Sequence, residues 1–390
     1  MSSSTVEDGL VIDMEAMKDI SIDKKNERVA IGGGCNWGEV YTALDEVDLM
    51  CAGGGVHVVG VGGHLTGGGY GPYSWNLAMA CDLVLQATVV IADGSIVTAS
   101  ETENPDLFFG IRGGSSSFGV ITQFVLQTLP RQGPYSLRTL GFPVSAVKEV
   151  DEALQKFMKQ DYAQRGLLPF LYMVRGPPPH HPPLLIVNLN GVGQASEIPE
   201  ALEPFLAMKP IFDQEKKFET MPEFSHVLDD LLLLGAPRKT TASAPITELW
   251  PGMVEEILKE YVDYTNSTPD ATAHTKVFFE FLHAKRLKPE GSCVPYIEPI
   301  HHMLIASDEH TDTKTDAAAD AFVTRVSSIG RKYQKKHGGR DLGANGNATT
   351  LVQKGDQIWL QNYPKLRKVK AKYDPNLVFN RYHTIEPDFS

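Results

Sequence analysis

A glycine-rich segment holds the residues best placed to do chemistry in this chain. Ten of its 35 glycines fall between Gly53 and Gly71, and the run Val58–Gly71 reads VVGVGGHLTGGGYG. Because glycine has no Cβ, successive backbone N–H groups can converge on an anion, and the chain can come into contact with a flat cofactor. The segment therefore predicts a loop that binds a phosphate-bearing or dinucleotide cofactor, with a merely flexible loop as the alternative.

Known nucleotide signatures do not account for this segment. No window fits G-x-G-x-x-G, and no Lys-Ser/Thr pair follows to make a P-loop, so Rossmann and Walker sites are excluded. His64 lies inside the run and is the one titratable side chain there apart from Tyr70. By residue type alone, its imidazole can cap a nearby carbonyl in a purely structural role.

The net charge of the chain limits which classes of molecule it is expected to bind. Asp plus Glu total 48 against 36 Lys plus Arg, a net charge of −12. An acidic surface repels phosphate backbones and anionic lipid headgroups, so neither nucleic acid nor a membrane is expected as a partner. No signal peptide or apolar span is visible in the sequence, and the chain as written is expected to be cytoplasmic.

Metal binding is not expected either. The four cysteines form no C-x-x-C pair and are interpreted as reduced and buried. The pairs His180-His181 and His301-His302 hold adjacent residues, which point to opposite faces of a strand, and no H-E-x-x-H spacing exists.

Two kinds of patterning divide the chain. Short β-rich runs in the N-terminal part predict a small mixed sheet: Leu10–Met14, Arg28–Ile31, Ala87–Ala92, Ser95–Ala99 and Val120–Leu129. From about Pro130, longer runs predict an α+β domain: Ala146–Lys159, Leu184–Leu189, Pro251–Thr265, Lys276–His283 and Thr315–Lys336.

Two further segments have simple interpretations. The proline-rich stretch from Gly176 to Pro183 predicts a surface loop between two strands. Pro364 near the first turn and Asp374-Pro375 at the end bound a C-terminal helix. Its basic run is expected to form a solvated face: Lys365, Arg367, Lys368, Lys370 and Lys372.

Further motifs follow the glycine segment at short intervals: Ala80-Cys81-Asp82, Ala92-Asp93-Gly94, Asn104–Gly114, Phe118–Ile121 and, near the end, Asn362–Asn380. In this order they resemble the flavin domain and the C-terminal ending of the vanillyl-alcohol oxidase and p-cresol methylhydroxylase superfamily. The similarity is specifically to its berberine-bridge-enzyme-like branch of FAD-linked oxidases. The matched segments span about residues 10–130 and 360–385.

The resemblance implies an α+β fold with two domains. Residues 1–133 would form the FAD-binding domain, residues 134–360 an inserted substrate domain with an antiparallel sheet covered by helices, and residues 361–390 a helix and tail that return to the flavin domain. The cofactor-binding residues implied are Val58, Gly60, Gly62, Gly63, His64, Gly67, Gly68, Gly69, Tyr70, Asp82, Gly119, Val120, Ile121, Asn380 and Tyr382. His64 would donate a hydrogen bond to the reduced flavin ring.

Departures from the family pattern are informative. Before the stretch corresponding to Thr5–Met14, family chains have a strand pair and a histidine-bearing loop that often binds the flavin covalently. This chain resembles an N-terminally incomplete member, and an upstream extension with a signal peptide would make it secreted. The family's second anchor, a cysteine, corresponds to Val56, so FAD is expected to be held non-covalently.

The catalytic base is a second departure. The branch commonly has a Tyr-x-Asn-Tyr motif, and the nearest match here, Asn345–Ala348, keeps Asn347 without either tyrosine. Strand alternation in Lys276–His283 puts Phe278 and Glu280 on one face and His283 on the other. Glu280 or His283 could serve as the base, and a solvated edge or a core-facing aromatic row is the alternative.

The function expected is FAD-dependent oxidation of a small aromatic or secondary-metabolite alcohol or amine, with hydride transfer to flavin N5 and molecular oxygen as acceptor. The alternative is a catalytically silent remnant that binds FAD poorly and acts as a binding module. A flavin dehydrogenase that passes electrons to another acceptor is a third possibility.

Overall fold

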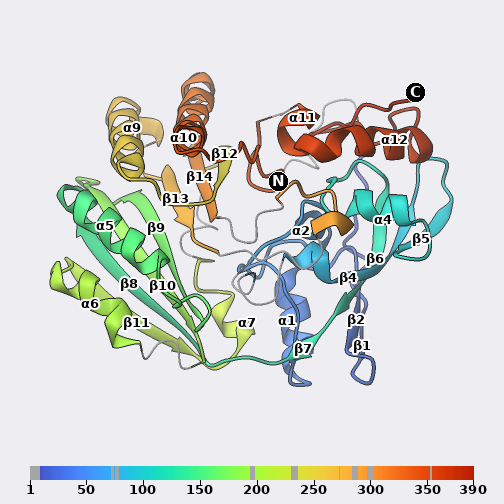
Figure 1. The fold of residues 1–390 in the computed structure, drawn as a ribbon, viewed down its shortest axis with the longest axis horizontal. Coiled ribbons are helices and arrows are strands. Elements are labelled where there is room, and N and C mark those ends of the chain that lie inside the picture. Colours follow the sequence, from blue (N-terminus) through green and yellow to red (C-terminus); the bar gives the residue numbers. More distant parts are fainter. Residues whose placement is uncertain are drawn as a thin grey trace.

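Two β-sheets, each with its own helices, lie side by side in the computed structural model (Figure 1). The structure describes residues 9–71, 74, 79–193, 198–229, 236–271, 273–282, 289–296, 302–351 and 354–390. Figure 1 shows the N-terminal and C-terminal parts of the chain sharing one half, while the middle of the chain forms the other. The protein therefore has the expected two-domain α+β fold, with the second domain inserted into the first.

The first domain is built on a five-stranded antiparallel sheet in the order β1-β2-β6-β4-β5. Its strands are β1 (Ile20–Asp23), β2 (Arg28–Gly32), β4 (Val84–Val90), β5 (Ile96–Ser100) and β6 (Val120–Gln127), and β3 (Leu49–Met50) pairs separately with β7 (Leu129–Pro130). Its helices are α1 (Trp37–Asp45), α2 (Val61–Thr66), α4 (Pro105–Ile111), α11 (Gly355–Ile358) and α12 (Tyr363–Tyr373).

Helix α1 shows how local sequence fixes the site's neighbourhood. Asn36 caps the helix, since its side chain accepts from the Glu39 backbone N–H and the Glu39 carboxylate accepts from the Asn36 N–H. The inward face of the helix buries Trp37, Val40, Tyr41 and Leu44 in the core of the first domain. Trp37 is thereby held rigidly beneath the glycine-rich segment.

Helix α12 ties the C-terminal part to this domain. Lys370 is fully buried, and its ammonium donates to Asp374 and to the carbonyls of Ser117 and Phe379 at 2.5–2.8 Å. The expected solvated basic face is therefore wrong for Lys370, because a buried cation with three acceptors crosslinks the tail to the N-terminal part. Lys365 instead covers the Phe109 ring of α4, at 3.6 Å from its centroid.

The second domain contains a seven-stranded antiparallel sheet in the order β11-β8-β10-β9-β13-β14-β12. Its strands are β8 (Tyr135–Pro143), β9 (Leu167–Arg175), β10 (Pro183–Val192), β11 (Phe212–Phe218), β12 (Arg238–Ile246), β13 (Lys276–Glu280) and β14 (His302–His310). Its helices are α5 (Val147–Met158), α6 (Pro199–Ala207), α7 (Met221–Phe224), α9 (Met253–Ser267) and α10 (Asp316–Lys336).

The two faces of this sheet have different roles. Helices α5, α6, α9 and α10 share one apolar core with alternate strand residues, among them Leu171, Val277 and Phe279. The intervening residues, such as Tyr172 and Phe278, form smaller clusters on the opposite face together with Tyr70 of the first domain. This second face is therefore turned toward the glycine-rich segment.

Several sequence expectations are confirmed and three need correction. The helices predicted at 146–159, 251–265 and 315–336 and the C-terminal helix lie where expected, as do most of the N-terminal strands, and the proline-rich stretch joins β9 to β10. Residues Leu10–Met14 are not a strand, because Leu10, Val11 and Ile12 are exposed and form no ladder within the described residues. Residues Val61–Thr66 are helical instead of loop, and β13 ends at Glu280. Among the helices of the described residues, none is long and apolar enough to cross a membrane.

Candidate active site

His64 lies on α2, and two contacts fix its ring. Its ring packs edge-on against Trp37, with centroids 5.4 Å apart, and its Nε2 lies 2.9 Å from the Tyr70 carbonyl oxygen. Since a carbonyl can only accept, Nε2 carries the hydrogen. Burial lowers the pKa of His64 from 6.5 to about 4, although the bond to Tyr70 opposes the shift. The imidazole is therefore neutral at pH 7.

This tautomer changes the role expected for His64. With its hydrogen on Nε2, the ring presents Nδ1 as a lone-pair acceptor, and Nδ1 is buried with no hydrogen-bond partner among the described residues. An acceptor atom cannot donate to a reduced flavin ring, so the donor role needs correction. A buried unpaired acceptor is costly, and a donor from a bound ligand would remove that cost.

Tyr70 connects His64 to the second domain. Its side chain packs with Phe278 and Ile305 of the inner sheet face and with the Phe170 cluster. Its phenol lies within hydrogen-bonding reach of the Glu280 carboxyl. One residue of the glycine-rich segment thus touches both His64, through its carbonyl, and Glu280, through its hydroxyl.

Glu280 is the last residue of β13, which lies in the interior of the sheet between β9 and β14. Strand alternation places it on the same face as Phe278, as predicted, while Phe279 and Phe281 point into the helix-covered core. Burial raises the pKa of Glu280 from 4.5 to about 7, and the bond to Tyr70 opposes part of this shift. Its Oε2 is buried with no partner within the described part of the chain.

An aromatic surface surrounds this carboxylate. Tyr172 stacks on Phe278 with centroids 5.6 Å apart, and Phe170 stacks on Tyr172 at 6.4 Å. Because Tyr70 joins the same clusters, the surface extends from the sheet to the glycine-rich segment. A flat ring or the C–H face of a sugar can pack against such a surface.

Asn347, the remnant of the family's tyrosine motif, has a structural contact with α2. Its Nδ2 donates to the His64 carbonyl oxygen at 2.9 Å, and its side chain occupies the space where Gly67 would carry a Cβ. In the same loop, the backbone carbonyl oxygen of Gly346 accepts a hydrogen bond from the Tyr382 hydroxyl at 3.4 Å. The loop at 345–348 therefore joins the C-terminal tail to the helix that carries His64.

The predicted cofactor residues fall into two groups. Val58, Gly60 and Gly63 are exposed, and a Cβ added at either glycine would meet nothing. The others are used largely for close packing within the protein. Positive φ angles and tight contacts occur at Gly68 (against Val294 and Met79), Gly69 (against His64) and Gly119 (against Val90), while Gly62 approaches Gly33 and Gly67 approaches Asn347.

The remaining predictions lie around these two groups. Val120 and Ile121 begin β6, Asp82 is buried in a short 3₁₀ helix, and Asn380 is exposed in the tail. His283 lies outside the described residues. Of the predicted residues, His64, Tyr70 and Glu280 are therefore brought together by contacts between the first domain and β13. Sequence patterns gave no signal for the surrounding Trp37, Phe170 and Tyr172.

The donor set fits a flavin in part. Two buried acceptor atoms have no partner among the described residues, Nδ1 of His64 and Oε2 of Glu280, and both side chains contact Tyr70. Open glycine backbone at Gly60 and Gly63 lies at the start and middle of the same helix. These are features of a surface that receives a large planar cofactor and a substrate.

Comparisons with known proteins identify the class. Residues 1–100 match the family model described as "FAD binding domain", and residues 341–386 match "Berberine and berberine like". The chain is 26% identical over 99% of its length to the FAD-linked oxidoreductase pgmH of Aspergillus terreus, covering 80% of that protein. It is also 26% identical over 98% of its length to glucooligosaccharide oxidase of Sarocladium strictum, covering 79% of it.

A solved structure supports the same class. Physcomitrella patens BBE-like 1 superposes with a TM-score of 0.82 at 20% identity, over 100% of this chain and 84% of that one. The fold is thus that of the FAD-linked oxidoreductases. Within them, the two family-model matches and the relatives support the berberine-bridge-enzyme-like branch of the vanillyl-alcohol oxidase and p-cresol methylhydroxylase superfamily, as the motifs at 58–71 and 362–380 predict.

Proposed function

We propose that this protein is an FAD-dependent oxidase of small alcohols, with Glu280 as the catalytic base and molecular oxygen as the electron acceptor. The observation that carries the proposal is the Glu280 carboxyl itself. Burial of the carboxyl raises its pKa to about 7, and its Oε2 atom is buried without a hydrogen-bond partner among the described residues, although the residue as a whole is only partly buried. A base whose pKa lies near the working pH is best suited to take a proton from a substrate.

The substrate proposed is a cyclic alcohol, either an aromatic secondary metabolite or a sugar. The stacked rings of Phe170, Tyr172 and Phe278 support a flat or ring-shaped ligand. A curated relative gives a precedent for the sugar, since it is a glucooligosaccharide oxidase.

Bound FAD supplies a hydride acceptor, and the protein's residues handle the proton. The Glu280 carboxylate accepts the hydroxyl proton of the alcohol as the C–H bond loses its hydride, which leaves a carbonyl product. The Tyr70 hydroxyl holds the carboxylate in place by a hydrogen bond and stabilises its charged form. Trp37 and the Tyr70 carbonyl fix the ring of His64, so that Nδ1 can accept a hydrogen bond from a bound ligand.

The mode of FAD binding is part of the proposal. Val56 offers no sulfur for a thioether, so the cofactor is proposed to be held non-covalently. The exposed glycine backbone at Gly60 and Gly63 would face it. The flavin domain is proposed to comprise residues 1–133 and 361–390, with residues 134–360 as the substrate domain, except that α11 within the latter range lies with the flavin domain because Ile358 packs in its core. In support, a single apolar core contains residues from β2, β6 and α12.

The proposed function is tested with the purified full-length chain supplied with FAD. Visible absorption before and after acid precipitation should show flavin bands that follow the folded protein and are released by acid. Anaerobic mixing with a panel of aromatic alcohols and oligosaccharides should bleach the bound flavin with at least one substrate, and admission of oxygen should restore the colour. A protein that takes up no added FAD would contradict the proposal and favour a silent relative.

A further inference from the structure

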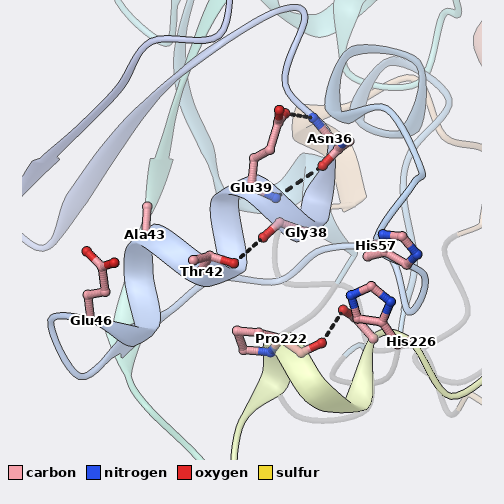
Figure 2. A pocket seen from close by; sticks show the side chains of 10 residues that line it. Asn36, Gly38, Glu39, Thr42, Ala43, Glu46, His57, Pro222 and His226 are labelled. Atoms are coloured by element: carbon pink, nitrogen blue, oxygen red, sulfur yellow. Dashed lines mark hydrogen bonds between the residues drawn. The ribbon is translucent and has the colours of Figure 1, made fainter.

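A second cluster of chemically active side chains lies away from His64 and Glu280. His57 precedes α2, and His226 and Asp229 follow α7 in the inserted segment. One ligand atom from each of the three residues lies within 4.8 Å of the others. The cluster adjoins a groove of about 500 Å³ between α1 and α7, and Figure 2 shows His57 and His226 side by side at one end of it.

The geometry within the cluster is specific. His57 Nε2 lies 3.0 Å from Oδ1 of Asp229, and His226 Nδ1 lies 2.8 Å from Oδ2 of the same carboxylate. The two imidazoles stack with centroids 3.7 Å apart and planes inclined by 26°. Each carboxylate oxygen thus lies within 3.0 Å of one ring nitrogen. The three side chains converge although they come from distant parts of the sequence.

The backbone holds these donors in place before any ligand binds. The His57 N–H donates to the Ser225 carbonyl oxygen at 3.2 Å, and the His57 carbonyl accepts from the Gly38 N–H at 2.9 Å. Near α7, the His226 N–H donates to Glu223, and the Asp229 N–H donates to His226. Helix α7 is itself anchored, since Met221 and Phe224 belong to the core of the first domain.

We propose that His57, His226 and Asp229 form a binding site for a divalent transition-metal ion, with Zn²⁺ the best fit. Two imidazole nitrogens and one carboxylate oxygen are a ligand set that Zn²⁺ accepts, and a fourth position would be filled by water from the groove. The ion would replace the hydrogen that now bridges His226 to Asp229, and it would give a partner to His57 Nε2 and Asp229 Oδ1, which have no hydrogen-bond partner among the described residues. Small rotations would let the ion sit between the three ligand atoms, at about 2.0–2.2 Å from each.

Such an ion would join the segment before α2 to the inserted segment after α7. Side-chain exposures of 20% for His57, 29% for Asp229 and 56% for His226 leave a path for the ion from solvent. Glu46, on the wall of the groove, adds a further negative charge that attracts cations. The site is separate from the proposed oxidase chemistry and does not depend on it.

The test is titration of the chelator-treated full-length protein with Zn²⁺ alone, followed by calorimetry. Wild type should bind one equivalent, and His226→Gln and Asp229→Asn should bind at least tenfold more weakly. His180→Gln is the matched control, because His180 is an exposed histidine in the proline-rich loop; it should bind as wild type does. Absence of binding to wild type, or unchanged binding by both cluster variants, would overturn the proposal.

A second measurement covers the case in which Asp229→Asn fails to fold. Wild type titrated with Co²⁺ should develop the visible bands of a four-coordinate ion, at wavelengths beyond those of flavin. The exposed substitution His226→Gln should abolish them while the thermal midpoint of the metal-free protein stays unchanged. Bands that are weak and octahedral, or that persist in His226→Gln, would contradict the site.

Discussion

Two polar clusters of this protein differ in whether their buried hydrogen-bonding atoms have partners. The fully paired cluster holds elements of the fold together, and the cluster with unpaired atoms is the proposed site of catalysis. The first centres on Asp308 and His310 at the end of β14. Asp308 Oδ2 accepts from Tyr264 and Thr275 at 2.9 and 2.6 Å, and its Oδ1 pairs with His310 at 2.6 Å. The other nitrogen of His310 pairs with Asp316, which also receives two bonds from Arg238.

In this first cluster every named group has its partner. Burial acts to lower the pKa of His310, but hydrogen bonds to Asp316 and Asp308 and their negative charge outweigh it and raise that pKa. The cluster packs the sheet against the start of α10. By contrast, the cluster of His64, Tyr70 and Glu280 leaves one nitrogen and one carboxylate oxygen buried and unpaired within the described residues.

The contrast between the two clusters indicates which buried groups stabilise the fold and which can bind a ligand. A satisfied buried network holds its elements in one arrangement, whereas unsatisfied buried atoms carry a cost of about 1–3 kcal/mol each that a ligand can remove. Substitutions should therefore affect stability at Asp308 and activity at Glu280.

The largest expected effect is on catalysis. Glu280→Gln keeps the shape of the side chain but cannot take a proton, so the anaerobic rate of flavin reduction should fall about 10²- to 10⁴-fold. The measurement is stopped-flow absorbance of the FAD-loaded protein. Glu203→Gln, an exposed change on α6, is the matched control and should leave the rate unchanged. A Glu280→Gln rate within threefold of wild type would remove Glu280 from the mechanism.

The second effect is on stability. Asp308→Ala removes the acceptor of Tyr264, Thr275 and His310 and leaves buried donors unpaired, which should cost about 3–5 kcal/mol of unfolding free energy. Urea unfolding followed by circular dichroism measures it. Asp263→Ala, which breaks the exposed pair with Lys259, should leave the midpoint nearly unchanged. If both variants lost equal stability, the Asp308 cluster would not be the structural one.

The third effect is a gain in the free energy of unfolding when Glu280 is substituted, whereas most substitutions lower it. The pKa of Glu280 is raised from 4.5 to about 7 in the folded state, so its protonated form stabilises the fold below pH 4.5. That contribution is lost as the pH rises through 7, because ionisation of the buried carboxyl then favours the unfolded chain. Between pH 5 and 8.5, Glu280→Gln should gain on the order of 2–3 kcal/mol relative to wild type. Urea unfolding at the two pH values measures this difference. An equal difference in unfolding free energy between Glu280→Gln and wild type at both pH values would refute the prediction.

The smallest effect concerns Tyr70. Its hydrogen bond lowers the pKa of Glu280 against the larger effect of burial. Tyr70→Phe should therefore move the midpoint of the pH–rate curve upward, by about one pH unit or less, while retaining packing against Phe278. A downward shift would mean that the phenol does not stabilise the carboxylate.

The sequence predicts the fold better than it predicts the site. Helices α5, α9, α10 and α12 lie where their periodicity or proline boundaries place them. Five of the seven strands of the larger sheet were not singled out. Some of them, such as β14, are buried on both faces and have no alternation to detect, whereas the edge strand β11 is largely exposed and polar. Residues Leu10–Met14 show the opposite error, because they were predicted to form a strand but are not one. An apolar run forms a strand only where a neighbouring strand can pair with it.

Residue types alone point to His64 and Glu280, but their environment comes from tertiary contacts. Tyr70 was expected at the cofactor, yet its bond to Glu280 connects segments that no local pattern relates. The same holds for His57 with Asp229, which is why the sequence predicted no metal site. The tautomer of His64 likewise depends on the Tyr70 carbonyl, a backbone atom that sequence motifs do not register.

The most direct test of Glu280 as the base is the pH dependence of flavin reduction by the best alcohol substrate, measured anaerobically between pH 5 and 9. Wild type should show a rate that rises with pH and levels off above a midpoint near 7, because only the carboxylate accepts a proton. Glu280→Gln should show a low rate without that inflection. An inflection near pH 7 that survives in Glu280→Gln would contradict the assignment and place the base elsewhere.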